Sequence, residues 1–133
     1  HTGFVFGHYH YTPLLGFGVA GVPLMIGINW ILMTYTTGTA ISIIDAPVWA
    51  RIIAAAIMMT LCDRLLEGFA IRHHLWIWDL GSSPVQNYIA WFVISLVLQT
   101  IYQLLIPKAK NKLTLIYLIV LALFLLGDNA LSN

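Results

Sequence analysis

The sequence predicts an all-α membrane protein: a bundle of about four transmembrane helices with an aromatic N-terminal segment that is extended or re-entrant. Of the 133 residues, 60% are hydrophobic and only 8% are charged, whereas a soluble domain carries roughly 25% charged residues. The apolar stretches are also long, and a membrane-spanning helix needs about 20 residues. We expect residues 1–133 to form a single transmembrane domain that is part of a longer chain.

The N-terminal segment from Thr2 to Thr12 alternates aromatic residues with small or polar ones. This alternation is typical of short extended pieces rather than of a helix. The stretch 14–22 is rich in glycine and is expected to be irregular. Pro23 suits the first turn of a helix, so the first span is predicted from Pro23 to about Ile44.

The second predicted span follows almost at once. Asp45 is placed to cap it, and its apolar pattern runs from Val48 to about Ile71. A polar and aromatic loop from Arg72 to Pro84 then connects it to the third span.

The third span is predicted from about Gln86 to Ile106, because Pro107 cannot continue a helix. Leu113 to Gly127 forms the fourth span, which is short against the length that a membrane crossing needs. The four spans together predict a bundle of four helices.

The orientation in the membrane is predicted from basic residues. The loop from Lys108 to Lys112 and Arg51 at the start of the second span belong to one end of the bundle. The positive-inside rule places that end in the cytoplasm, and we expect a bacterial inner membrane. The aromatic N-terminal segment and the loop from Arg72 to Pro84 then meet at the opposite face.

Two carboxyl groups inside the second span are the strongest functional signal. Asp63 and Glu67 are four residues apart, which places them on one face of the helix. Ionisable groups at membrane depth are costly and usually functional. The alternative is structural: Arg64 lies between them, and an ion pair would fix helix packing.

Other polar and aromatic residues allow more than one interpretation. His8 and His10 would share one face of an extended segment, as metal ligands, proton donors or interfacial filler. We predict no metal site, since two histidines with distant carboxylates are a weak pattern. Trp76 and Trp78 are typical of an aromatic belt, and Asn87 of a hydrogen bond between helices.

Two classes of function are excluded by composition. The net charge is only +1 and no basic stripe is visible, so we expect no nucleic-acid partner. Cys62 is the single cysteine, so it has no partner for a disulfide or a cysteine-based metal site.

Five pieces of sequence form a joint pattern: TGFVFGHYHY at 2–11, GVPL at 21–24 with Asn29 and Trp30, DRLLE at 63–67, WIW at 76–78 and PVQNYIAWF at 84–92. In this order and spacing they resemble the integral-membrane carotenoid biosynthesis proteins, a family that includes carotenoid hydratases of the bisanhydrobacterioruberin hydratase type. The similarity extends from the N-terminus to about Ser95. Two features depart from the family pattern: Gly68 follows Glu67 where many members have proline, and the chain is shorter than most members.

The resemblance implies a hydro-lyase that adds water to the terminal double bond of an acyclic carotenoid end, without a cofactor. The implied partners are an acyclic, apolar carotenoid and membrane lipid, and a homo- or hetero-oligomer in the membrane stays open. The same chemistry, run in another direction, would dehydrate an alcohol or isomerise a double bond.

Alkene hydration needs a strong acid in an apolar site and a water molecule for the tertiary cation. A carboxyl group held away from water beside a second carboxylate can supply such an acid. Asp63 and Glu67 can divide these tasks, with His8 or His10 helping to orient the water, and the division stays open. The substrate-binding residues implied by the resemblance are Tyr9, Tyr11, Asn29, Trp30, Trp76, Trp78, Asn87 and Trp91.

Two functions of other classes remain as alternatives. The chain can be a noncatalytic carotenoid-binding or structural subunit of a larger membrane complex, which a short fourth helix favours. A proton-coupled transporter also uses intramembrane carboxylates, but the sequence has no internal repeat and no pair of broken helices.

Overall fold

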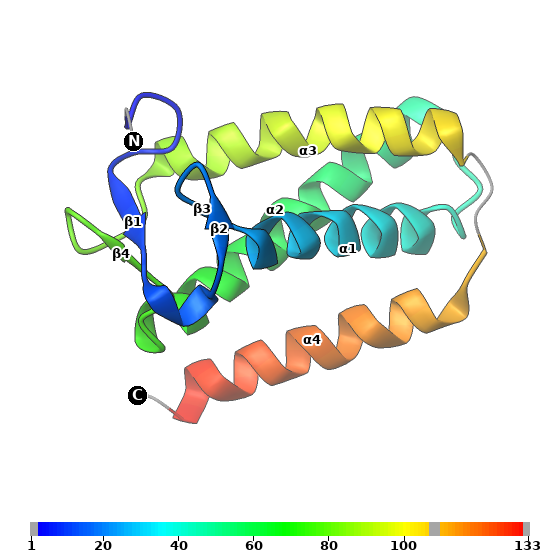
Figure 1. Ribbon diagram of the computed structural model, residues 1–133. Helices are drawn as coiled ribbons and strands as arrows, with labels where there is room; N and C mark the ends of the chain where they lie inside the picture. The colour runs from blue at the N-terminus through cyan, green and yellow to red at the C-terminus, as the bar shows by residue number, and fades with distance from the viewer. Residues whose placement is uncertain (1–2, 107–109, 132–133) are drawn as a thin grey trace.

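The computed structural model describes residues 3–106 and 110–131, and their main feature is a bundle of four helices. Helices α1 and α3 run in one direction and α2 and α4 in the other (Figure 1). Short strands lie at one end of the bundle, here called the strand end. The opposite end, where α3 ends and α4 begins, is called the lysine end after Lys110 and Lys112. The helices are α1 Leu24–Ile41, α2 Val48–Arg72, α3 Val85–Leu105 and α4 Lys112–Leu131.

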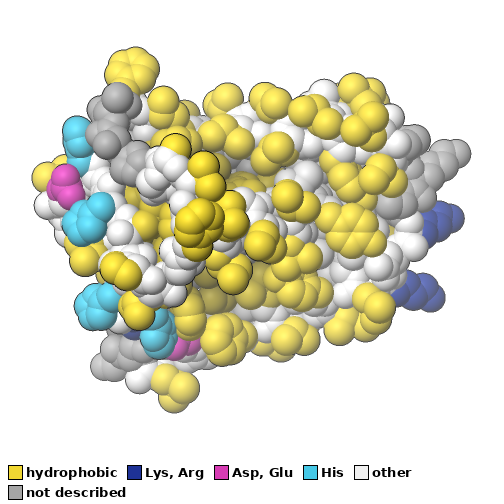
Figure 2. Space-filling model, in the orientation of Figure 1, with side chains coloured by type: hydrophobic (Ala, Val, Ile, Leu, Met, Phe, Trp, Pro, Cys, Tyr) yellow, Lys and Arg dark blue, Asp and Glu magenta, His cyan; other side chains and the backbone are white. Residues whose placement is uncertain are grey.

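The surface of the bundle has the composition of a membrane protein. Of the described helices, α1, α3 and α4 are long and apolar enough to cross a membrane. Helix α2 has 25 residues but carries several charges, and it packs against all three other helices. Apolar side chains cover the middle of the bundle, while histidines and acidic groups gather at the strand end and basic groups at the lysine end (Figure 2). The predicted fold class is confirmed.

Several predicted helix boundaries differ from the structure. Asp45 does not cap α2: Pro47 occupies the position before the helix, and no side chain caps it. The fourth helix is not short, because α4 continues to Leu131 and has 20 residues. The predicted helix stop at Pro107 lies outside the described residues, as does Lys108. Helix α3 ends just before, at Leu105.

The aromatic N-terminal segment is extended, as predicted, over Tyr9–Tyr11, which follow a turn at residues 4–6. Strand β1 Tyr9–Tyr11 pairs antiparallel with β4 Trp76–Trp78, which lies in the loop between α2 and α3. The stretch expected to be irregular contains a 3₁₀ turn, Pro13–Leu15, and a hairpin of β2 Gly18–Val19 and β3 Val22–Pro23. Positive φ angles at Ala20 and Gly21, 53° and 80°, suit its type I′ turn. The hairpin leads directly into α1.

Helices α1 and α3 are joined by buried polar contacts. The Tyr102 hydroxyl lies 2.5 Å from Thr39 Oγ1, and Gln103 Nε2 donates to the Gly38 carbonyl oxygen at 3.1 Å. Gln99 Nε2 donates to Thr37 Oγ1 at 2.9 Å. Hydrogen bonds of this kind and small residues are typical of helix pairs in membranes. These hydrogen bonds fix the second half of α1 against α3.

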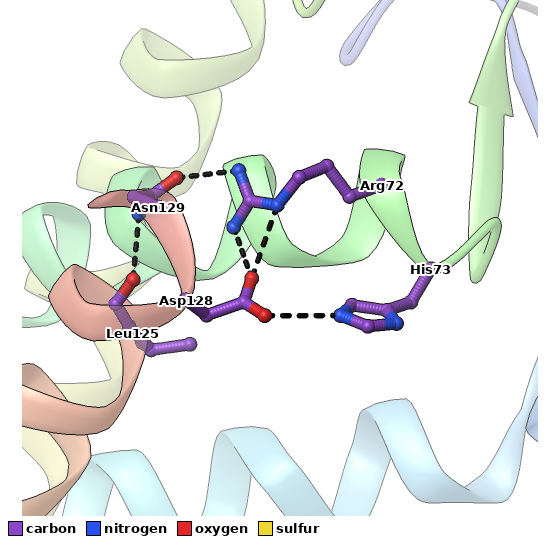
Figure 3. Close-up of polar contacts among 5 residues, drawn as sticks. All are labelled: Arg72, His73, Leu125, Asp128 and Asn129. Carbon is purple, nitrogen blue, oxygen red and sulfur yellow. Dashed lines mark hydrogen bonds and ion pairs between the residues drawn. The ribbon is translucent and has the colours of Figure 1, made fainter. Parts of the chain in front are cut away.

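Helices α2 and α4 are joined at the strand end (Figure 3). Arg72 Nε donates to Asp128 Oδ2 at 3.0 Å and Arg72 Nη1 to Asn129 Oδ1 at 2.6 Å. His73 Nε2 lies 3.2 Å from Asp128 Oδ1. A Cβ atom on Gly68 would lie 2.6 Å from Asn129 Oδ1. The glycine after Glu67 therefore gives room for the side chain with which α4 binds α2.

Gly38 provides a test of the α1–α3 contact. A Cβ atom there would lie 2.5 Å from the Tyr102 ring and 2.7 Å from Gln99 Oε1, whereas a Cβ atom on Gly27 would meet nothing within 4 Å. We expect Gly38→Ala to lower the free energy of unfolding by about 1–3 kcal/mol through overpacking. Gly27→Ala, the control, should leave it unchanged or raise it by up to about 1 kcal/mol. Thermal unfolding in detergent, followed by circular dichroism, measures both, and equal stabilities would contradict the packing described.

Candidate functional site

Glu67 is a buried carboxyl group bound by two tryptophans. Its side chain is 3% exposed, and its Oε1 accepts hydrogen bonds from Trp76 Nε1 at 3.0 Å and from Trp78 Nε1. Alternate residues of a strand point to the same side, so β4 directs both indoles inward and leaves Ile77 exposed. The belt interpretation of these tryptophans is wrong: both rings are buried and bind the acid.

Strand β1 adds two tyrosines to the same inner side. Tyr9 lies opposite Trp78 and Tyr11 opposite Trp76 in the antiparallel register. The Tyr9 and Trp78 ring centres are 4.8 Å apart, and the two tyrosine hydroxyls lie 3.2 Å from each other. Burial, and then the hydrogen bond with Tyr9, raises the pKa of Tyr11 above its ordinary value. Tyr11 therefore remains a neutral phenol that can donate or accept a hydrogen bond.

Asp63 lies one helical turn before Glu67 and is bound differently. Its Oδ2 is buried and has no hydrogen-bond partner among the residues that the structure describes. Arg64 is exposed, and its guanidinium carbon lies 5.8 Å from the centre of the Tyr88 ring. Within the described chain, Arg64 forms no ion pair with either acid. The ion pair that offered a structural explanation of Asp63 and Glu67 is therefore not formed.

These side chains surround a pocket of about 390 Å³ at the strand end. All the predicted site residues except the two histidines line it. Sequence reasoning missed Ile26 and Leu66, although helical spacing from Asn29 or Trp30 and from Asp63 would have indicated both. The lining residues are Tyr9, Tyr11, Ile26, Asn29, Trp30, Asp63, Leu66, Glu67, Trp76, Trp78, Asn87 and Trp91.

The two histidines predicted to take part in catalysis lie elsewhere. His8 and His10 are both exposed. His10 Nδ1 lies 3.7 Å from Asp79 Oδ1, also at the surface. Neither histidine is among the residues lining the pocket, so their catalytic role stays a prediction without support from a contact with the acids.

One wall of the pocket contains two stacked tryptophan rings, one from α1 and one from α3. The Trp30 ring of α1 lies 3.9 Å from the Trp91 ring of α3, with an angle of 16° between their planes. Phe6 packs against Trp91 at 4.8 Å. Asn87 is buried nearby, and its Nδ2 donates to Ser83 Oγ at 3.1 Å, within the local turn rather than to another helix. The pocket thus combines π faces with a few polar groups.

Asp63 also borders a second cavity of about 330 Å³, which shares Asn29, Trp30 and Leu66 with the pocket and is otherwise lined by apolar residues and Cys62. Among the described residues, His, Cys, Asp and Glu side chains do not form a group of three or more that could hold a metal ion. The chemistry available to the pocket is that of two carboxyl groups, phenols, amides and indoles.

The hydrogen bonds to Glu67 can be tested through Trp78. Trp78→Phe keeps an aromatic ring but removes one donor from a buried acid, and we expect it to cost about 1–3 kcal/mol of unfolding free energy. Trp49→Phe, on the same fold, should change little, because Trp49 is 64% exposed. Denaturation of both variants in detergent micelles gives the comparison. Equal stability of Trp78→Phe and the wild type would show that the bond is absent.

A search of curated proteins and a search of solved structures find no match to this chain. The family model described as "Carotenoid biosynthesis protein" matches residues 1–131. This range contains every residue of the pocket and all four helices. The chain therefore belongs to the carotenoid biosynthesis protein family.

Proposed function

We propose that this protein is an integral-membrane enzyme that adds water to the terminal double bond of an acyclic carotenoid end. The observation that carries the proposal is the pocket itself. Aromatic and apolar walls enclose two carboxyl groups on one face of α2: one is bound by indole donors, and the other has a buried oxygen without a hydrogen-bond partner among the described residues. An apolar alkene fits such walls. Its hydration needs an acid and a group that accepts a proton from water.

The different surroundings of the two acids suggest their roles. Glu67 Oε1 is engaged by the indole N–H groups of Trp76 and Trp78, so this carboxyl group is held in place as an acceptor. Asp63 Oδ2 lacks a protein partner among the described residues, which leaves that oxygen available to a ligand. We therefore assign the proton donor to Asp63 and the acceptor of the water proton to Glu67.

The reaction then has two steps. The Asp63 carboxyl proton forms a bond to the less substituted alkene carbon with the π electrons, leaving a tertiary cation at the other carbon. The oxygen of a water molecule bonds to that cation, and its surplus proton goes to Glu67. Transfer of this proton from Glu67 back to Asp63 restores the starting state, so the net change is the consumption of one water molecule.

The remaining pocket residues have supporting roles in this proposal. The π faces of Trp30, Trp91 and the two tyrosines stabilise a positive charge in their vicinity. Buried Asn87 can bind the water by its amide. This assignment replaces His8 and His10 as groups that orient the water, because neither lines the pocket.

We further propose that the protein lies in a bacterial inner membrane with its lysine end in the cytoplasm. Basic residues, with Lys110 and Lys112 among them, lie at the lysine end of the bundle (Figure 2). The positive-inside rule puts this end on the cytoplasmic side of a bacterial inner membrane. The pocket at the strand end would then lie near the opposite face of the membrane.

Amide variants test the acid pair. In cells that accumulate an acyclic carotenoid, we expect Asp63→Asn and Glu67→Gln to lower the yield of product heavier by one water at least about 100-fold, since each removes a proton-transfer group. Asp45→Asn, an exposed acid outside the pocket, serves as the control and should keep full activity. Mass spectrometry of extracted pigments measures the product, and immunoblotting and circular dichroism check amount and fold.

Two results would contradict the proposal. Unchanged product in both acid variants would exclude carboxyl acid catalysis at this site. Pigment that copurifies with the wild type, without any hydrated product, would instead support the noncatalytic carotenoid-binding subunit. One reason to prefer that alternative has gone, because α4 is 20 residues long rather than short.

A further inference from the structure

We propose that the groove between α1 and α3 binds the polyene chain of the carotenoid while its end group occupies the pocket. This inference rests on the proposed function and extends it from the reacting end to the whole substrate. The groove lies outside the acid pocket, on the surface of the bundle that would face the lipid.

The size of the pocket requires a second binding region. A carotenoid is a stiff rod comparable in length to the hydrocarbon core of a bilayer, roughly 30 Å. The pocket measures only about 390 Å³ and lies at one end of the bundle, so it can hold an end group but not the rod. Most of the substrate must therefore lie outside the pocket, along a surface that is continuous with it.

Such a surface begins at Trp30. This residue lines the pocket and also a groove of about 800 Å³ between α1 and α3. The groove follows α3 from Leu98 to Leu105, which at the rise of an α-helix is about 11 Å, and also includes Ile106 just beyond the helix. Because the chain order of both helices runs away from the strand end (Figure 1), the groove extends from the aromatic wall of the pocket towards the lysine end.

The groove offers hydrocarbon and aromatic rings to its occupant. Its few polar side chains have partners within the protein. Thr34 Oγ1 donates to the Trp30 carbonyl oxygen at 2.8 Å, the Tyr102 hydroxyl lies 2.5 Å from Thr39 Oγ1, and the Tyr35 hydroxyl accepts from Asn111 Nδ2 at 3.1 Å. An occupant without polar groups is thus favoured over one that needs hydrogen bonds.

Hydrogen bonds between α1 and α3 also hold the two sides of the groove in place. Gln99 Nε2 donates to the Thr34 carbonyl oxygen at 3.1 Å, and Gln103 Nε2 to that of Gly38 at 3.1 Å. These bonds hold α1 and α3 at a fixed separation beneath the groove. A preformed groove suits a rigid polyene, because neither the protein nor the polyene loses much conformational freedom when the polyene binds.

The test places bulk in the groove without touching the pocket. Ile101 lines the groove and is 51% exposed, whereas Leu104 on the same helix is 68% exposed and does not line it. The variants Ile101→Trp and Leu104→Trp are purified from cells that make an acyclic carotenoid. Visible absorbance gives the polyene bound per protein. Turnover is measured with the carotenoid and with a short isoprenoid alkene that has the same terminal double bond.

We expect Ile101→Trp to lose bound polyene and to hydrate the carotenoid at least about tenfold more slowly, while its turnover of the short alkene stays at the wild-type level. Leu104→Trp should equal the wild type in every measurement. If Ile101→Trp does not fold, Leu105→Trp at the rim of the groove replaces it, since Leu105 is 75% exposed.

The outcomes separate this inference from the proposed function. Normal polyene binding and carotenoid turnover in Ile101→Trp would overturn the groove as the binding site. Phospholipid that copurifies with each protein is assayed as well. Its loss from Ile101→Trp with unchanged pigment would show that the groove binds lipid, and this would also overturn the proposal. If the wild type hydrates neither substrate, and Ile101→Trp loses its pigment while Leu104→Trp keeps it, the groove would be supported and the hydratase function overturned.

Discussion

The site depends on one contact: the Glu67 carboxyl group accepts hydrogen bonds from two indole N–H groups. A carboxyl group buried in an apolar bundle is costly unless it is hydrogen-bonded, and here its partners come from a three-residue strand, β4. The contact therefore fixes a loop segment on the inner side of α2. Because β4 pairs with β1, it also determines where Tyr9 and Tyr11 lie.

The two acids of α2 share a helix face but not an environment. Glu67 is hydrogen-bonded by residues of strand β4. Asp63, one turn further from the strand end, borders both the pocket and the second cavity. One of its oxygens is buried and has no hydrogen-bond partner in the described chain. Structural polar groups in cores are normally satisfied. An open carboxyl oxygen beside a satisfied one is the kind of local cost that functional sites retain.

The fold was predictable because composition and apolar length decide it, and the acid pair because helical spacing places Asp63 and Glu67 on one face. The partner of Glu67 was not predictable. Trp76 and Trp78 lie in a polar loop at a helix end, a pattern shared with membrane-belt anchors. Only the pairing of β4 with a strand more than sixty residues earlier turns their indoles inward.

The end of α4 illustrates the same limit. Gly127, Asp128 and Asn129 are poor helix formers, and the sequence alone places the helix end there. In the structure α4 continues through them, because Asp128 and Asn129 bind Arg72 at the end of α2 (Figure 3). A contact between distant segments outweighs the local propensity, and no pattern within α4 announces it.

The depth of the site agrees with what hydration of a carotenoid would demand. Glu67 lies five residues and Asp63 nine residues before Arg72, the last residue of α2, so the carboxyl groups are roughly 8 and 14 Å from the helix end. In the proposed reaction, one reactant, the polyene, would be dissolved in the hydrocarbon core, and the other, water, would not. For that reaction, a site at this depth, lined by aromatic rings and sharing Trp30 with the apolar groove, can receive the alkene from the lipid while water has only a short distance to travel from the helix end. A site at the middle of the bundle would exclude the water, and one on the surface would expose the cation to solvent.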